Sequence, residues 1–290
     1  MKRFFSLMGI SLLCPVVAAW GQVLPANSAG VAMGYWHTIV RDVDVTKKFW
    51  STMGGTPLKI DGVDVIKMPG VLVFMAQGEP AGGNDGNKGT AIDHPGFTLL
   101  NGEKLLNKLK AAGYKVEPIG NPIYGPESGY VTTPDGLRIE MQGNEANLAK
   151  RPALSFTGKN LDVPVATDHL HYFLPVSASP EAQAWYGKVL GANLLQEENR
   201  DRSLAGDLPG IRLRFAASRN ATTLLPTKGR AMDRIGFEVK NLEAFCKRLE
   251  ASGVKLDQPY TKTRHKSYAS AELTDPWGVS IELTEGLSHF

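Results

Sequence analysis

His94-Pro-Gly-Phe97 and Arg234-Ile-Gly-Phe237 are related stretches that stand 140 residues apart in the chain. The same offset separates the two segments that follow them, Asn101–Gly113 and Asn241–Gly253. In each segment, apolar residues recur at helical spacing between an asparagine that can cap a helix start and a glycine that can form a left-handed turn after the helix. The recurrence predicts an internal duplication in which each copy contains a strand followed by an amphipathic helix.

A turn and an alternating strand close each copy, at Thr133-Pro-Asp-Gly-Leu-Arg-Ile-Glu140 and Asp275-Pro-Trp-Gly-Val-Ser-Ile-Glu282. Because successive side chains of a strand point to opposite faces, each final glutamate faces away from its apolar neighbours. Each half begins on the same plan, with His37-Thr-Ile-Val and His171-Tyr-Phe-Leu ahead of a predicted helix. Each half therefore has the order strand, helix, strands twice, and residues 144–167, which show no periodicity, are the predicted linker.

The first 21 residues have the character of an export signal. Lys2 and Arg3 precede an apolar stretch from Phe4 to Ala19, and a small residue follows at position 21. The stretch is short for a membrane span, and the residue before Cys14 is a leucine instead of the small residue of a lipoprotein signal. We therefore expect residues 1–21 to be a removed signal peptide and the mature protein to be periplasmic or extracellular, without a membrane anchor.

Composition limits the classes of partner. The whole chain carries 32 Lys and Arg against 29 Asp and Glu, and loss of Lys2 and Arg3 with the signal leaves the mature protein nearly neutral. Such a balance favours neither nucleic acid nor an anionic membrane surface as a partner. One of the two cysteines lies in the signal, so Cys246 has no partner for an intrachain disulfide. The fold must therefore depend on packed cores, and the length suits two domains.

The succession of modules resembles the vicinal oxygen chelate superfamily, which includes glyoxalase I, bleomycin resistance proteins and type I extradiol dioxygenases. The resemblance rests on the repeated helices, the Pro-Asp-Gly turn and the Ile-Glu strand endings, and it spans about residues 33–286. It implies an α+β fold in which four βαβββ modules form two domains with cupped sheets, an N-terminal one at 33–143 and a C-terminal one at 168–286. In this superfamily two modules form one cup, and a metal lies inside it.

The resemblance implies metal ligands at His37, His94 and Glu140. These positions match the first strand of one module and the first and last strands of the next. Two neutral imidazoles and one carboxylate can hold a divalent ion such as Fe, Mn or Zn and leave positions open for a substrate. Glyoxalases usually supply a fourth ligand near residues 71–77, where this chain has neither carboxylate nor histidine. The set of three is closer to that of the extradiol dioxygenases.

Tyr130 precedes Glu140 by ten residues and is similar to the active-site tyrosine of the superfamily. Its phenol could hydrogen-bond an oxygen atom at the metal, which makes Tyr130 the predicted catalytic residue; packing within its strand is the alternative. Ring-cleaving dioxygenases also place a catalytic histidine between the first two ligands, and residues 38–93 contain none. Catechol cleavage is therefore disfavoured, and isomerase, lyase and other oxygenase reactions stay open.

The second half resembles a damaged copy of the same site. His171 and Glu282 match outer ligand positions, but Arg234 occupies the position of His94. A guanidinium stays protonated and offers no lone pair to a metal, so we expect no metal in the C-terminal domain. Arg234 is expected to pair with Glu282 inside that cup. His169 is the alternative to His171 as the equivalent position, and both are predicted to be structural.

These features together predict one divalent metal ion per chain and a small-molecule substrate that chelates it. The predicted activity is that of a metal-dependent dioxygenase, isomerase or lyase acting on a small oxygenated molecule. The alternative is a protein that sequesters a small molecule without turnover, as bleomycin resistance proteins do. A scaffold with two degenerate cups is disfavoured by the triad, and the oligomeric state is open.

Overall fold

A computed structural model of the protein describes residues 23–119, 126–143, 164–196, 203–218 and 223–290. The predicted signal peptide and most of the predicted linker lie outside these ranges, and residues 165–167 of that linker already belong to a strand. Among the described residues, no helix is both long enough and apolar enough to span a membrane.

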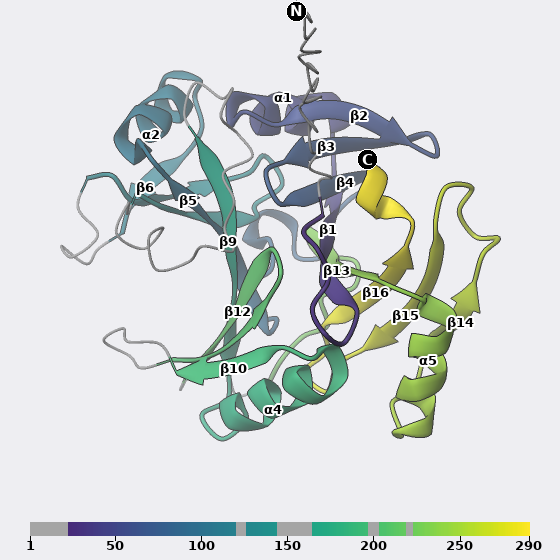
Figure 1. The fold of residues 1–290 in the computed structure, drawn as a ribbon. Coiled ribbons are helices and arrows are strands. Elements are labelled where there is room, and N and C mark those ends of the chain that lie inside the picture. The colour runs from purple at the N-terminus through teal and green to yellow at the C-terminus, as the bar shows by residue number, and fades with distance from the viewer. Residues whose placement is uncertain (1–22, 120–125, 144–163, 197–202, 219–222) are drawn as a thin grey trace, which may run out of the picture.

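The described chain consists of four βαβββ modules, as the resemblance implies (Figure 1). Module 1 comprises β1 (Val31–Val40), α1 (Val43–Thr52), β2 (Thr56–Ile60), β3 (Val63–Met68) and β4 (Val71–Gln77). Module 2 comprises β5 (Ile92–Leu99), α2 (Gly102–Ala111), β6 (Val116–Pro118), β7 (Gly129–Thr132) and β8 (Arg138–Gln142). Module 3 comprises β9 (Val165–Leu174), α4 (Ser179–Leu190), β10 (Asn193–Gln196), β11 (Leu204–Leu208) and β12 (Ile211–Ala217). Module 4 comprises β13 (Met232–Val239), α5 (Leu242–Ala251), β14 (Gln258–Thr261), β15 (Ala269–Thr274) and β16 (Ser280–Glu285), and short 3-10 helices occupy Gly83–Asp85 and Leu287–His289.

The strands form two mixed sheets, each of eight strands among the described residues. Modules 1 and 4 form one sheet, in the order β14-β15-β16-β13-β1-β4-β3-β2, which we call the outer-module sheet. Modules 2 and 3 form the other, in the order β10-β11-β12-β9-β5-β8-β7-β6, which we call the inner-module sheet. The predicted α+β class and the two sheets built from βαβββ modules are confirmed.

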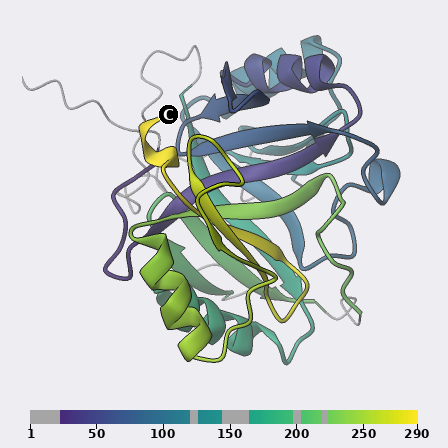
Figure 2. The ribbon, with the colours of Figure 1, turned by 90° about the vertical axis from the view of Figure 1, so that its right-hand side faces the viewer.

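The pairing of the modules differs from the prediction. Antiparallel β1 and β13 join module 1 to module 4, and antiparallel β5 and β9 join module 2 to module 3 (Figure 2 shows β1 beside β13). The predicted domains at 33–143 and 168–286 therefore do not coincide with the two sheets, and the expectation that consecutive modules share a cup is wrong. The edge of a first strand presents the same backbone donors and acceptors in every module, so the repeat predicts that first strands pair but not which ones do.

The main hydrophobic core lies between the two sheets. Trp36 on β1 and Phe97 on β5 are fully buried, and their ring centroids lie 5.4 Å apart in an edge-to-face arrangement. Phe49 and Trp50 of α1 extend the same core. Because side chains alternate along a strand, Tyr35 and the other neighbours of Trp36 face the opposite side of the sheet, inside the cup.

The helix ends follow the sequence signals with one exception. Asn101 caps α2 through its side chain, which accepts an N–H bond from the first turn at 3.2 Å. Gly113 and Gly253 each have φ of +88°, which confirms the left-handed turns predicted after α2 and α5. Asn241 is not a side-chain cap: its own φ is +55°, and the Glu285 carboxylate accepts the N–H of Asn241 at 2.9 Å and that of Leu242, the first residue of α5, at 3.1 Å. A carboxylate from β16 thus replaces the predicted asparagine cap.

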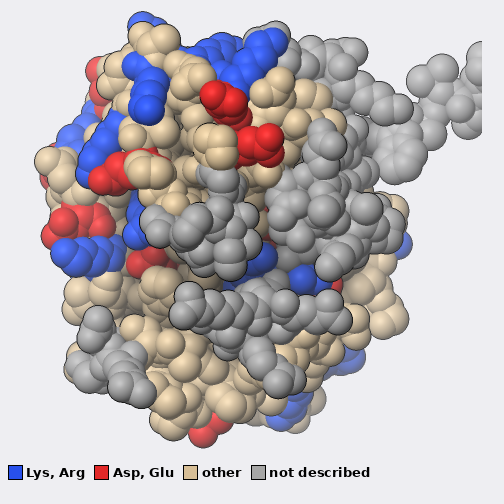
Figure 3. Space-filling view, turned by 90° about the vertical axis from the view of Figure 1, so that its left-hand side faces the viewer, with Lys and Arg blue, Asp and Glu red and all other residues tan. Residues whose placement is uncertain are grey.

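Charged side chains of both signs are interspersed on the surface. On the face shown in Figure 3, neither Lys and Arg nor Asp and Glu form a continuous patch among the described residues. This distribution matches the close balance of 32 basic and 29 acidic residues in the sequence.

Candidate metal centre

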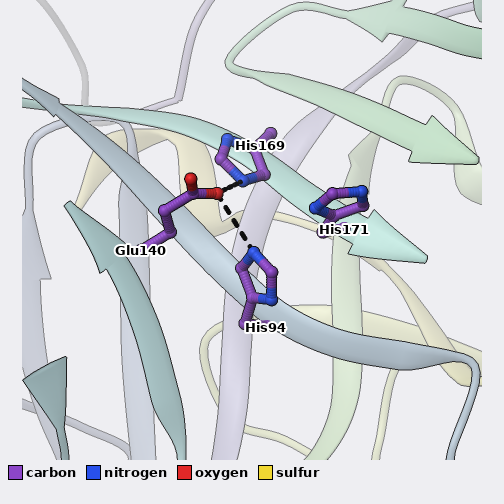
Figure 4. Close-up of side chains that lie close together, drawn as sticks. All are labelled: His94, Glu140, His169 and His171. Carbon is purple, nitrogen blue, oxygen red and sulfur yellow. Dashed lines mark hydrogen bonds and ion pairs between the residues drawn. The ribbon is translucent and has the colours of Figure 1, made fainter. Parts of the chain in front are cut away.

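Four side chains converge in the inner-module cup: His94 from β5, Glu140 from β8, and His169 and His171 from β9 (Figure 4). One ligand atom from each lies within 4.8 Å of all the others. Strand register brings them together, because His94 is opposite His171, and Gly96, two residues on, is opposite Glu140. The alternation of β9 then places His169 on the same face as His171. Such a group could hold one metal ion.

The structure does not bring His37 to this group. β1 belongs to the outer-module sheet, where His37 is opposite Arg234 and its Nδ1 lies 3.3 Å from Asp233 Oδ2. The three predicted ligands are therefore divided between the two cups, and the two histidines of β9, predicted to be structural, stand beside His94 and Glu140. The resemblance implies ligands from the first strand of one module and from the first and last strands of another. The structure has this pattern, but the first strand comes from module 3 instead of module 1.

Two of the imidazoles contact an aspartate through the ring nitrogen that does not face Glu140. His94 Nδ1 lies 2.5 Å from Asp93 Oδ1, and His169 Nδ1 lies 2.8 Å from Asp168 Oδ2. The other ring nitrogen, Nε2, of each histidine lies 3.1 and 3.0 Å from Glu140 Oε2 respectively. A carboxylate behind the imidazole fixes its tautomer and orientation, which is the usual support of a metal-bound histidine. The sequence signal for this arrangement is the Asp-His dipeptide, which occurs at 93–94 and again at 168–169.

Several imidazole nitrogens in the cup have no hydrogen-bond partner among the described residues. Burial, reinforced by the charge of Arg214, lowers the pKa of His169 to about 3, so its ring is neutral near pH 7. If Nδ1–H donates to Asp168, the Nε2 lone pair faces Glu140 Oε2 at 3.0 Å without a hydrogen bond. Burial also holds the pKa of His171 well below its usual value, and neither of its ring nitrogens has a hydrogen-bond partner among the described residues. Buried lone pairs turned toward a carboxylate are costly unless a cation lies among them, and this donor set fits a divalent metal.

The contact between His94 and Glu140 shifts the pKa of both groups. Burial lowers the pKa of His94, but its bonds to Asp93 and Glu140 outweigh this and raise the pKa above the usual histidine value. Burial raises the pKa of Glu140, but its contacts with His169 and His94 hold the pKa well below the usual range. Glu140 is therefore ionised at neutral pH and available to a cation.

Tyr130 lies beside the four residues. It is opposite Glu140 in the pairing of β7 with β8, and its ring centroid is 5.5 Å from that of His94. The Arg138 guanidinium carbon lies 3.5 Å from the centre of the Tyr130 ring. Burial and the charge of Glu140 raise the pKa of Tyr130 to about 12, so the phenol keeps its proton at neutral pH. The structure thus places the predicted catalytic tyrosine in the cup that contains the four convergent side chains.

Arg214 is a second charged neighbour, which the sequence did not single out. It lies opposite His171 in the pairing of β12 with β9, in the way that Phe74 lies opposite His37 in the other sheet. Its positive charge contributes to the lowered pKa of both His169 and His171. A basic side chain therefore stands in β12, the strand of module 3 that is equivalent to residues 71–77 of module 1, where glyoxalases usually supply a fourth ligand.

Comparisons with known proteins agree with this architecture. The model of the Glyoxalase/Bleomycin resistance protein/Dioxygenase superfamily matches residues 169–283. Glyoxalase I from Zea mays superposes with a TM-score of 0.65 at 16% identity, covering 89% of this chain and 93% of that chain. A mutant of the maize enzyme gives a TM-score of 0.64 at 17% identity, with 89% of this chain and 93% of that chain covered.

A Bacillus subtilis subsp. subtilis str. 168 protein, whose proposed activity is that of a dioxygenase, has a TM-score of 0.60 at 14% identity, with 88% of this chain and 84% of that chain covered. No curated protein matches the sequence at a significant level. At these identities the structural likeness establishes the fold, and the family match adds the sequence pattern of modules 3 and 4. Residues 169–283 match the Glyoxalase/Bleomycin resistance protein/Dioxygenase superfamily, and the chain as a whole shares its fold with glyoxalase I.

Proposed function

We propose that the protein is an exported, metal-dependent enzyme that acts on a small oxygenated molecule in the inner-module cup. The observation that carries the proposal is the set of buried ring nitrogens of His169 and His171 that have no hydrogen-bond partner among the described residues and lie close to the ionised Glu140. His94, Glu140 and the two histidines of β9 would hold one divalent ion. When bound, such an ion supplies Lewis acidity that polarises a substrate oxygen and stabilises negative charge developing on it.

The side chains around the site define what the protein itself contributes to the reaction. Tyr130 keeps its proton, since its pKa is about 12, and its phenol can donate a hydrogen bond to a substrate oxygen. Arg214 adds a permanent positive charge near His169 and His171, which favours a substrate with anionic or strongly polarised oxygen atoms. Phe173, whose ring centroid is 4.7 Å from that of His171, supplies an apolar surface beside the cup. These groups suit a dioxygenase, isomerase or lyase.

Elemental analysis of the purified mature protein tests the metal site. We expect about one equivalent of divalent metal per chain, and its loss in His94→Ala and Glu140→Gln, because each change removes a donor atom from the group of four. His37→Ala is the matched control, since His37 occupies the position in β1 that His171 occupies in β9. Full metal content in His94→Ala, or its loss in His37→Ala, would contradict the proposed site.

Assays with and without oxygen separate the reaction classes. Oxygen consumption with small diols would identify a dioxygenase, and anaerobic turnover of hydroxyketones or hemithioacetals would identify an isomerase or lyase. Tyr130→Phe is expected to lower kcat with little change in metal content, because the phenol does not belong to the group of four. Metal binding and ligand binding without turnover of either class would instead establish the sequestering function.

Chelation should destabilise the folded protein. A ligand that binds only the folded state adds about 2.7 kcal/mol at a free concentration 100-fold above its Kd. We therefore expect excess chelator to lower the Tm of the wild-type protein by several degrees, measured by scanning calorimetry, and re-addition of the metal to restore it. His94→Ala should show no such shift, and an equal shift in that variant would place the stabilising metal elsewhere.

Export is proposed from the leader alone. Lys2 and Arg3 followed by the apolar stretch to Ala19 support cleavage near residue 21. The intact mass of the protein recovered from the periplasm or medium should correspond to a chain without residues 1–21. A full-length chain that stays in the cytoplasmic fraction would rule out export.

A further inference from the structure

The outer-module cup contains a cavity of about 250 Å³ that is separate from the four convergent side chains. Its lining comes from both modules of that sheet and includes Phe74 of β4, from module 1, and Tyr268 ahead of β15, from module 4. Pockets for drug-sized molecules occupy roughly 300–1,000 Å³, so this cavity suits a smaller ligand.

One wall of the cavity is aromatic. Tyr35 and Phe74 have ring centroids 4.8 Å apart, and Phe74 and Tyr268 have centroids 6.4 Å apart. His265 stacks on Tyr268 at 4.0 Å with an interplanar angle of 12°. Tilted and edge-on rings at these distances form a surface on which a further planar ring can pack.

The other wall is charged, and its acidic groups are already paired. Glu272 lies 2.7 Å from Arg264 Nη1 and 3.3 Å from Arg234 Nη1. Glu282 accepts a hydrogen bond from the Tyr35 hydroxyl and lies 3.6 Å from Arg234 Nη1. The two glutamates and two arginines that line the cavity therefore balance, and each carboxylate has at least one guanidinium beside it. Glu282 Oε1, which has no hydrogen-bond partner among the described residues, lies 3.4 Å from His265 Nε2.

Basic atoms remain more accessible than acidic ones on this wall. The side chains of Arg264 and Arg234 are 30% and 23% exposed, whereas those of Glu272 and Glu282 are 12% and 4% exposed. Among the described residues, the ion pairs of Arg234 use Nε and Nη1, which leaves its Nη2 amine for a ligand. The cavity thus offers hydrogen-bond donors beside an aromatic surface.

We propose that the outer-module cup is a second, metal-independent binding site for a small aromatic carboxylate. The carboxylate would accept hydrogen bonds from Arg234 and Arg264, and the ring would pack against Tyr35, Phe74 and Tyr268. Arg234 occupies in this cup the position that His94 occupies in the inner-module cup. Its guanidinium would therefore bind the ligand oxygens in place of a metal ion. The site does not depend on the function proposed for the inner-module cup.

Calorimetric titration with benzoate tests this site in the full mature protein with excess chelator present. We expect saturable binding of one benzoate per chain. Benzyl alcohol and benzamidine, which keep the ring but carry no charge or a positive charge, should bind at least tenfold more weakly, because they cannot accept the paired hydrogen bonds from guanidinium groups. Equal or tighter binding of either compound, or no saturable benzoate binding, overturns the proposal.

Variants locate the binding within the molecule. Arg264→Gln and Phe74→Leu should each weaken benzoate binding about tenfold or more. The Arg264 side chain is 30% exposed, so Arg264→Gln should leave the fold intact. It therefore serves as the test if Arg234→Gln, which changes the other guanidinium, does not fold. His94→Ala should bind benzoate as the wild type does. Loss of binding in His94→Ala, or unchanged binding in both Arg264→Gln and Phe74→Leu, would place the ligand outside the outer-module cup.

Discussion

The two cups share one backbone plan and differ in a few side chains at their centres. Glu140 and Glu282 occupy equivalent positions, as do His171 and His37, because each pair has the same place in the strand register. Among the four positions of the convergent group, two differ: the inner-module cup has His94 and His169, and the outer-module cup has Arg234 and Tyr35. The comparison shows how few changes separate a cup with convergent donor atoms from a cup with a guanidinium beside its glutamate.

Arg234 supplies in the outer-module cup the positive charge that the other cup would take from a metal. Its Nε lies 2.9 Å from Asp233, and its Nη1 lies 3.6 Å from Glu282, which is the ion pair predicted from the sequence. Tyr35, in the place of His169, donates a hydrogen bond to Glu282. A buried carboxylate without such partners would be strongly destabilising. Glu282 thus lies beside a permanent positive charge and a hydroxyl donor, whereas Glu140 lies among imidazoles that can also bind a metal.

Exchange of the differing residues is the strongest way to break the comparison. Tyr35→His combined with Arg234→His would give the outer-module cup histidines at the three positions equivalent to His94, His169 and His171, beside Glu282, with Asp233 next to position 234 as Asp93 is next to His94. We expect the metal content to rise from about one to about two equivalents per chain, measured by elemental analysis after equilibration with Zn²⁺.

The single change Tyr35→His is the control for this exchange. It keeps Arg234, whose charge and bulk occupy the centre of the cup, so its metal content should stay near one equivalent. A double variant that folds but still binds one metal would show that features of the inner-module cup beyond these two positions, such as Asp168 or Arg214, are needed.

The repeat could be predicted from the sequence because the signals that define a module are local. The helix between Asn101 and Gly113, the turn before Glu140 and the alternation of the last strand each depend on neighbouring residues, and they recur in the second half. His94 and Glu140 were found together for the same reason, since both belong to module 2 and face one side of its strands.

The partner module was not predictable, because antiparallel pairing of first strands is long-range and depends on backbone groups common to all modules. The sequence therefore groups His37 with His94 and predicts structural roles for His169 and His171, whereas the structure places the two histidines of β9 beside His94. The Asp-His dipeptides at 93–94 and 168–169 were a usable signal, since an aspartate ahead of a ligand histidine can support its ring.

The turns before the last strands offer a comparison based on charge. Thr133 Oγ1 accepts the Leu137 N–H at 3.1 Å in module 2, and Asp275 Oδ1 accepts the Val279 N–H at 2.7 Å in module 4. Both residues are buried, but only Asp275 can ionise. Burial raises the pKa of Asp275 to about 6 from 3.8, although its hydrogen bonds, including one from Tyr186, oppose the rise.

A carboxyl group with a raised pKa in the folded state binds its proton more tightly there. Its contribution to stability is therefore fully present below pH 3.8 and is lost as pH rises through about 6. We expect the free energy of unfolding of the wild type, measured relative to Asp275→Asn, to fall by up to about 3 kcal/mol between pH 4 and pH 7. Urea unfolding at several pH values measures this difference, and a difference independent of pH would show that the Asp275 carboxyl titrates alike in both states.

Two glycines make the mildest and most symmetrical test of the two cups. A Cβ at Gly96 would lie 2.1 Å from His169 Cε1, and a Cβ at Gly236 would lie 1.9 Å from Tyr35 Cε1, so each glycine leaves room for the ring across the strand pair. Gly96→Ala and Gly236→Ala should therefore both lower the free energy of unfolding in chelator, by about 1–3 kcal/mol, because the ring must move from its packed position. Only Gly96→Ala should also weaken metal binding, since it displaces His169 from Glu140, whereas Gly236→Ala displaces a tyrosine that belongs to no metal site.

Metal titration of the two variants distinguishes these effects. If Gly96→Ala keeps wild-type metal affinity, His169 is a structural neighbour of the site, and the donors reduce to His94, Glu140 and His171.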